Sequence, residues 1–180
     1  MFGLYIFRMR REQENALVFA VAIALAIWAL GLGLALSAPT QEVSVLWRRI
    51  AGLGWGTFFS FLLHFLLVLT IHKPDRKTWW LLLPLYLPAA LNVLVFTIPT
   101  QLNPMPFNMV ETPLGWVNVA EYNAWDIYFV AFYISAVVTG IVIVCHWGLK
   151  SSDERVRKQS KLLFVTFAAA LVLGTMTDMV

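Results

Sequence analysis

The stretch that decides the fold is LVFAVAIALAIWALGLGLAL, residues Leu17–Leu36, which contains no charged, amide or hydroxyl side chain. A run of about 20 apolar residues can cross the hydrocarbon core as a helix, because a helix satisfies its own backbone in lipid. Over all 180 residues, 60% are apolar and 13% are charged. A soluble domain has about 45–50% apolar and about 25% charged residues. The chain is therefore predicted to be an integral membrane protein without a sizeable soluble domain.

The predicted fold is an all-α polytopic membrane bundle, a single membrane-embedded unit over residues 1–180. Five spans are expected, at about 17–36, 50–71, 79–98, 125–147 and 162–177. The connection over 99–124 is long and contains FNMVE and WVNVA on either side of TPLG. Two β-prone runs around a turn with proline and glycine predict a small extracytoplasmic β-hairpin at about 104–120. This hairpin is either a lid that carries Trp116 or a plug over polar helix ends.

The basic residues predict the orientation of the bundle. Eleven of the 13 fall on alternate connections, and only Arg48 and Arg49 fall on the others. The eleven are Arg8, Arg10, Arg11, Lys73, Arg76, Lys77, Lys150, Arg155, Arg157, Lys158 and Lys161. Positive charge stays in the cytoplasm, so the segment at Arg8–Arg11 is expected inside and residue 180 outside the inner membrane. The net charge of +3 is thus a topology signal, and no nucleic-acid partner is expected.

Three segments near the ends and connections carry further signals. The first residues, MFGLYIFRMRREQEN, and the last, VLGTMTDMV, read as cut ends, so we expect this chain to be an excerpt of a longer protein. Ser151 and Glu154 have the spacing of a capping box, which predicts a helix that starts near Ser152 and runs unbroken into the fifth span.

Polar side chains form a stripe inside the second predicted span. Thr57, Ser60 and His64 share one helical face, and lipid would make that face costly, so it should contact protein. Similar depth makes Tyr86 the expected partner of His64, while Asn92 should lie nearer the outer face, close to Thr57. The third span also contains Pro84 and Pro88, which bend a helix or free its carbonyls.

A second polar stripe is expected on the fourth span. Its members are Tyr128, Phe132, Ser135, Thr139 and His146.

Three interpretations of these stripes stay open. Polar bonds between helices, worth about 0.6–2 kcal/mol each, explain them without any ligand. Alternatively, His64, Ser60, Tyr86 and Asn92 line a binding site for a small or apolar signal, with Trp116 on its lid. Metal or proton chemistry is the third, but the histidines differ in depth and no carboxylate lies deep in a span. No catalytic site, metal site or cofactor is predicted.

Several motifs resemble the N-terminal seven-transmembrane sensor region of bacterial histidine kinases, which also precedes diguanylate cyclase domains. They are RMRREQENALVFAVAIALAIWALG, WRRIAGLGWGTFFSFLLHFLLVLT, LYLPAALN, TPLGW and RKQSKLL. In that resemblance Leu63–Phe65 match a Leu-His-Phe motif, and Tyr86 with Pro88 match a Tyr-x-Pro motif. The five spans would be the family's second to sixth, so the first and last spans are missing here.

The resemblance implies a sensory input region that passes a helix rearrangement to a cytoplasmic kinase or cyclase module. The chain itself is expected to be no enzyme. Its expected partners are membrane lipids, a small or apolar signal, and a second copy or a larger membrane complex. The main alternative is a non-catalytic accessory or structural subunit of such a complex. A fragment of a transporter or membrane enzyme is a third reading, but transporters often show internal repeats, and this sequence shows none.

Overall fold

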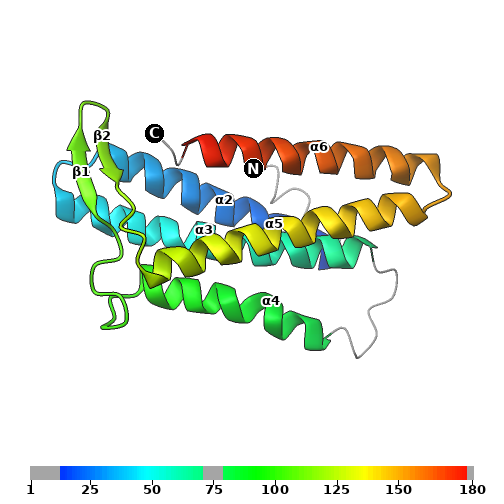
Figure 1. Ribbon diagram of the computed structural model, residues 1–180, viewed down its shortest axis with the longest axis horizontal. Helices are drawn as coiled ribbons and strands as arrows, with labels where there is room; N and C mark the ends of the chain where they lie inside the picture. The colour runs from blue at the N-terminus through cyan, green and yellow to red at the C-terminus, as the bar shows by residue number, and fades with distance from the viewer. Residues whose placement is uncertain (1–12, 71–78, 178–180) are drawn as a thin grey trace.

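A computed structural model describes residues 13–70 and 79–177. These residues form five α-helices, one π-helical turn and a two-stranded sheet (Figure 1). In chain order the elements are α2 (Gln13–Leu36), α3 (Gln41–Thr70), α4 (Trp79–Asn92), the π-helix η2 (Val93–Thr97), β1 (Met109–Thr112), β2 (Gly115–Asn118), α5 (Ala124–Lys150) and α6 (Glu154–Thr177). The predicted helical bundle with a small hairpin is confirmed. The predictions for Arg8–Arg11, for the connection around Lys73 and for residue 180 lie outside the described residues.

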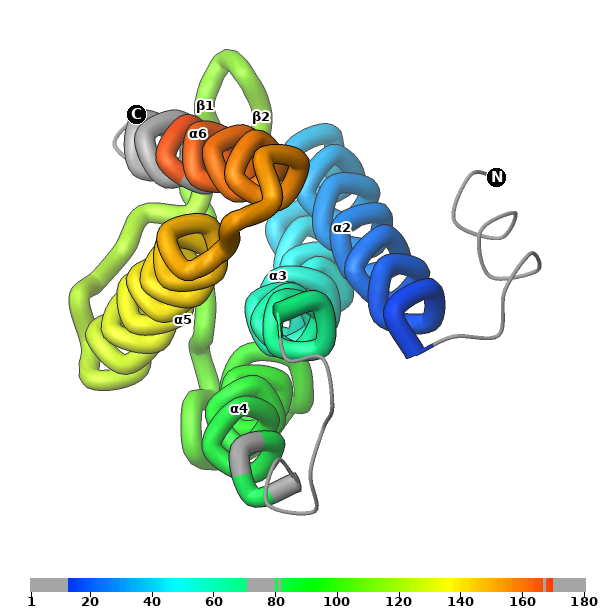
Figure 2. The backbone as a smooth tube through the Cα atoms, turned by 90° about the vertical axis from the view of Figure 1, so that its right-hand side faces the viewer, coloured from blue at the N-terminus to red at the C-terminus, as the bar shows by residue number. Residues whose placement is uncertain are grey.

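Helix α3 lies in the middle of the bundle. Seen end-on, α2, α4 and α5 surround it, and α6 lies on the far side of α5 (Figure 2). Helices α2, α4 and α5 each contact α3, whereas α6 packs on α5. The hairpin β1–β2 caps one end of the bundle, here called the hairpin end, and the α5–α6 connection marks the opposite end (Figure 1).

Three of the described helices are long and apolar enough to cross a membrane: α2, α3 and α5. The third predicted span, 79–98, corresponds to α4 and η2 together, Trp79–Thr97, and Leu82–Thr97 within it is apolar. The fifth predicted span does not meet the same criterion within the described residues. Its helix α6 begins with charged turns that hold Arg155, Arg157, Lys158 and Lys161.

Helix α3 starts nine residues before the predicted span at 50–71, so the helix is longer than that span at its N-terminal end. The Thr40 hydroxyl accepts a hydrogen bond from the Val43 amide at 3.4 Å, and Glu42 lies in the first turn. Both features are typical of a helix start. Apolarity alone misses such a start because the first turns of α3 are polar.

The predicted capping box at Ser151 and Glu154 is wrong. Ser151 ends α5 with extended backbone, and its hydroxyl accepts from the Asp153 amide at 3.1 Å. Asp153 then caps α6 by accepting from the Arg155 amide at 2.8 Å. The true capping box lies at the other end of α5, where Asn123 and Asp126 each accept a backbone N–H of the other.

Glycines allow α2 and α3 to cross closely. A Cβ on Gly54 would meet the Ala24 carbonyl oxygen and would lie 2.5 Å from the Trp28 nitrogen. A Cβ on Gly31 would lie 2.8 Å from the Ala51 Cβ. Since lipid tails are as apolar as leucine, helices in membranes associate through close packing of this kind rather than through the hydrophobic effect.

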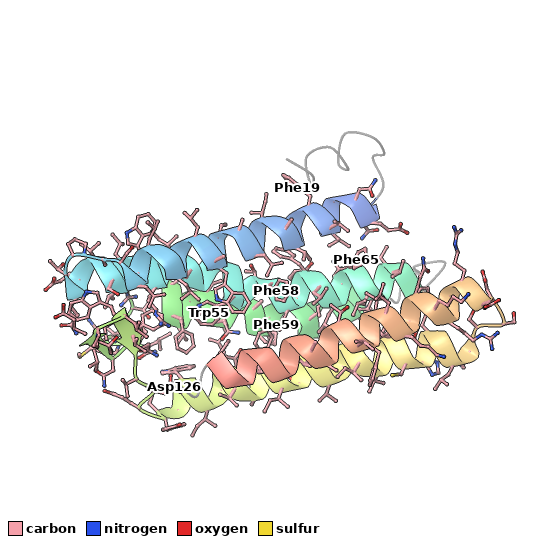
Figure 3. All side chains as sticks on the ribbon, turned by 90° about the horizontal axis from the view of Figure 1, so that it is seen from above. Phe19, Trp55, Phe58, Phe59, Phe65 and Asp126 are labelled. Atoms are coloured by element: carbon pink, nitrogen blue, oxygen red, sulfur yellow. The ribbon has the colours of Figure 1, made fainter. Side chains whose placement is uncertain are left out.

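Aromatic rings of α3 fill the space toward its neighbours (Figure 3). Phe58 packs on Trp28 of α2 with ring centroids 6.0 Å apart. Trp55 meets Phe129 of α5 at 4.5 Å in an edge-to-face arrangement, and Phe59 meets Tyr133 at 5.2 Å. Edge-to-face pairs add about 0.5–1.5 kcal/mol beyond area burial, so these rings fix how α2 and α5 sit against α3.

Replacing Gly54 by alanine should destabilise the bundle, because the new methyl group meets backbone of α2 that cannot move aside. We expect the free energy of unfolding to fall by about 1–3 kcal/mol, measured by SDS-driven unfolding in mixed micelles. Gly33→Ala is the matched control on α2, because a Cβ there meets nothing within 4 Å. Equal losses for the two variants would contradict the close crossing.

Candidate functional site

The hairpin is anchored to the turn between α2 and α3. Strands β1 and β2 pair antiparallel with Val110 opposite Val117. The Trp116 indole N–H donates to the Ala38 carbonyl at 3.0 Å. Gly115 has φ +112°, a backbone region that favours glycine, and a Cβ there would strike the Leu36 carbonyl oxygen. Trp116 therefore fastens the hairpin to the end of α2.

His64 links three helices. Its Nδ1 lies 2.8 Å from the Tyr86 hydroxyl of α4, which confirms the predicted pairing of these two residues. Its Nε2 lies 3.3 Å from the Gln13 side-chain nitrogen of α2. In a neutral imidazole one nitrogen donates and the other accepts. If the Gln13 amide donates to Nε2, then Nδ1 carries the proton and donates to Tyr86.

The hydroxyls of Ser60 and Tyr128 bond backbone carbonyls of α4, the helix that contains two prolines. The Ser60 hydroxyl donates to the Leu85 carbonyl at 2.6 Å, and the Tyr128 hydroxyl of α5 donates to the Pro88 carbonyl at 2.9 Å. Proline removes an intrahelical N–H and crowds the turn before it. Side chains of α3 and α5 thus bond carbonyls in this part of α4.

Asn92 is the most enclosed of the predicted residues. Its side chain is fully buried. Gly56 of α3 lies opposite it, and a Cβ built on Gly56 would be 3.4 Å from the Asn92 Cβ. Neither atom of its side-chain amide has a hydrogen-bond partner. Thr57, the stripe member beside Gly56, bonds the Leu53 carbonyl of its own helix at 2.6 Å instead.

The structure brings together only part of the predicted site. His64, Ser60 and Tyr86 lie within one turn of each other along α3 and α4. Asn92 lies about two turns nearer the hairpin end than His64, which is roughly 12 Å along the bundle at about 1.5 Å per residue. Trp116 is beyond the start of α3, roughly 35 Å from His64 by the same rise. The five residues therefore occupy three levels along α3 rather than one pocket.

A shallow polar cleft lies at the hairpin end, lined by residues between Met105 and Asp126, and none of the five predicted residues lines it. Within residues 13–70 and 79–177 no cluster of three His, Cys, Asp or Glu side chains could hold a metal ion.

Sequence reasoning missed two contacts. Gln13 lies ahead of the first apolar run, so its depth was the only feature of the sequence that could have indicated its contact with His64. Ser160 of α6 donates to the Val144 carbonyl of α5 at 2.7 Å and packs against Gly148. A serine opposite a glycine is the pattern that would have indicated this contact.

The second stripe is only partly directed at protein. Tyr128 bonds α4, but Ser135, Thr139 and His146 are exposed on the bundle surface.

Three apolar helices of membrane-spanning length, packed together with the proline-bearing helix α4, define a multi-pass helical membrane protein. Residues 1–179 match the family model of the N-terminal 7TM region of histidine kinase. The chain belongs to this family, and it is a sensory input region of the histidine-kinase type. Such a region is not catalytic by itself. Comparison with curated proteins and with solved structures gave no match.

Removing the bond between His64 and Tyr86 should weaken the bundle in a way that depends on both residues. In a double-mutant cycle of His64→Ala and Tyr86→Phe, we expect a coupling energy of about 0.6–2 kcal/mol. The measurement is SDS-driven unfolding of the two single variants and the double variant. Tyr122→Phe is the control, because Tyr122 lies on the connection between β2 and α5 and is 79% exposed. A coupling energy of zero would show that the bond does not hold α3 and α4 together.

Replacing Trp116 by phenylalanine should loosen the hairpin without unfolding the helices. The loss of one hydrogen bond, about 1 kcal/mol, corresponds to roughly fivefold faster amide hydrogen exchange in residues 109–118. Mass spectrometry after deuterium labelling measures this exchange. Trp80→Phe on α4, where the ring is 78% exposed, should leave the hairpin exchange unchanged. Unchanged exchange in Trp116→Phe would rule out the indole as the anchor.

Proposed function

We propose that the bundle detects a small or apolar signal and passes a helix rearrangement to a cytoplasmic output module. The observation that carries this proposal is the chain of side chains from Gln13 through His64 to Tyr86. It joins α2, α3 and α4 at one level, so a movement of any one helix changes the bonds of the other two. The output module would be a histidine kinase or a diguanylate cyclase domain.

The mechanism rests on two packings of the same helices. A ligand shifts such an equilibrium only if it binds the two arrangements unequally. His64, Ser60, Tyr86 and Asn92 all line the contact between α3 and α4, and each has a bond or a burial that a shift of α4 would alter. Trp116 holds the hairpin over the far end of the same helices. A signal that enters between α3 and α4 would therefore favour one packing.

The proposed orientation places the α5–α6 connection in the cytoplasm. Lys150, Arg155, Arg157, Lys158 and Lys161 gather at that end of the bundle, and positive charge favours the cytoplasmic side. In this orientation the segment near Arg8–Arg11 is cytoplasmic and residue 180 is extracytoplasmic, in the inner membrane. Membrane lipids surround the bundle, and a second copy or a larger complex would be its protein partner.

The rival function is an accessory or structural subunit that carries no signal. The observation in its favour is that His64, Ser60 and Tyr86 all have protein partners. Polar contacts of this kind stabilise a membrane bundle without any ligand. The two functions differ in one measurable property, since a sensor needs two helix packings and a structural subunit needs one.

Distances between the ends of α4 and α5 test this difference. Spin labels are placed on Trp80→Cys of α4 and Leu149→Cys of α5, at positions that are 78% and 86% exposed. Pulsed electron paramagnetic resonance in nanodiscs then measures the distance between the two labels. A Cys145→Ala background is required because Cys145 is the one natural cysteine. A sensor should show two distance populations, and Tyr86→Phe should change their ratio about 3-fold to 30-fold. A single population that Tyr86→Phe leaves unchanged would support the structural subunit.

A further inference from the structure

Asn92 presents a problem that the proposed function does not solve. Its side chain is 0% exposed, and both its amide oxygen and its amide nitrogen lack a hydrogen-bond partner. Buried polar groups in proteins are almost always bonded, because a buried donor or acceptor left unpaired carries the full cost of its lost solvation. A donor and an acceptor, side by side on one amide, are thus available to a partner that the protein itself does not provide.

The surroundings of Asn92 explain why α3 offers no partner. Two of the α3 residues that face this segment are glycines: Gly56 is opposite Asn92, and Gly52 is opposite Thr97, while Trp55 between them packs on Phe96. A Cβ on Gly52 would lie 2.6 Å from the Thr97 hydroxyl oxygen, and that oxygen is also buried without a hydrogen-bond partner. This contact, here called the glycine seam, therefore has bare backbone on one side and two unpaired polar groups on the other.

The backbone beside the seam is unusual in the same place. Asn92 is the N-cap of the π-helical turn η2, Thr97 is its last residue, and Ile98 after it is extended. The Ile98 amide bonds the Val93 carbonyl at 3.2 Å, five residues back, a type of turn that occurs at helix C-termini. The two unpaired polar groups therefore lie at the two ends of one turn.

We propose that the glycine seam binds the signal, and that the signal is a slim apolar molecule whose polar end carries a hydrogen-bond donor next to an acceptor, as in a primary carboxamide. Such an end group pairs with Asn92 through two hydrogen bonds, and its apolar body lies between α3 and η2. This inference rests on the proposed sensory function and names its ligand class. The molecule enters from the bilayer, where an apolar body partitions.

The seam also couples binding to helix movement. At Gly52, α3 lies so close to η2 that a methyl group would press on the Thr97 hydroxyl, and at Gly56 a methyl group would already be in van der Waals contact with Asn92. A ligand at Asn92 must therefore part α3 from η2, which means that it binds the parted arrangement and not the closed one. Unequal binding of this kind is what a ligand needs in order to shift a conformational equilibrium.

Two photoreactive probes test the ligand class. Both have the same diazirine-bearing alkyl chain, one ending in a primary carboxamide and the other in a methyl ester, which can accept but not donate. The 180-residue chain is labelled in nanodiscs, and peptides containing residues 52–56 and 92–97 are quantified by mass spectrometry. We expect about tenfold more labelling by the carboxamide probe, since the one hydrogen bond that the ester cannot donate amounts to roughly that factor in affinity.

Variants assign the preference to Asn92. Asn92→Leu keeps the size of the side chain and removes an unpaired buried amide, so the fold should be retained, as a thermal melt by circular dichroism verifies. The variant should label equally with both probes. Asn108→Leu, an exposed asparagine near the hairpin, is the matched control and should keep the tenfold preference. Equal labelling of the natural chain, or a preference that survives Asn92→Leu, would overturn the proposal.

The spin-label distances separate this inference from the proposed function. The carboxamide probe should shift the two distance populations of the natural chain and leave those of Asn92→Leu unchanged. Two populations without any probe preference at the seam would leave the sensor standing and remove the glycine seam as its ligand site. A probe preference with a single, unshifted population would overturn the sensory function and reduce the seam to a static binding site.

Discussion

Polar side chains inside an apolar solvent have to find their partners within the protein, and the rest of this structure depends on that constraint. Water cannot pair them in the hydrocarbon core, so each buried hydroxyl, imidazole or amide either bonds its own helix or a neighbouring one, or stays costly. Ser60, His64 and Tyr128 meet the constraint by bonding α4. Asn92 does not meet it, and it lies where α4 changes to η2.

Close approach makes these bonds possible. Glycines on α3 let both α2 and the α4–η2 segment come near enough for backbone to meet side chains. The same glycines leave α3 without groups that could pair Asn92 or Thr97. Different glycines of α3 serve the two sides: Gly54 meets α2, whereas Gly52 and Gly56 lie against Thr97 and Asn92. Close packing on the α2 side and unpaired polar groups on the α4 side thus both follow from residues without a side chain.

The polar contacts lie at different levels along the axis of the bundle. At the hairpin end, Trp116 ties β2 to the turn after α2, while the middle holds the unpaired Asn92. Toward the other end, His64 joins three helices, and Ser160 ties α6 to α5. A change in the middle therefore has fixed contacts on both sides of it. Helix α4 is bonded to α3 and α5 on the side of Asn92 away from the hairpin.

The sequence by itself determined that the bundle lies in a membrane, that its fold is helical, that it carries a small hairpin, and which residue bonds His64. Runs of apolar residues dictate membrane helices, and two polar residues at equal depth on neighbouring helices have few other partners to choose. The sequence also placed Asn92 nearer the outer face than His64, close to Thr57. Only the tertiary structure decided that Trp116 stands far from His64, that Gln13 completes the bonds of His64, and that α3 begins at Gln41. Depth fixes one coordinate of a residue in a bundle, whereas contact also requires the rotation of each helix and its distance from the next, which packing at glycines and prolines decides.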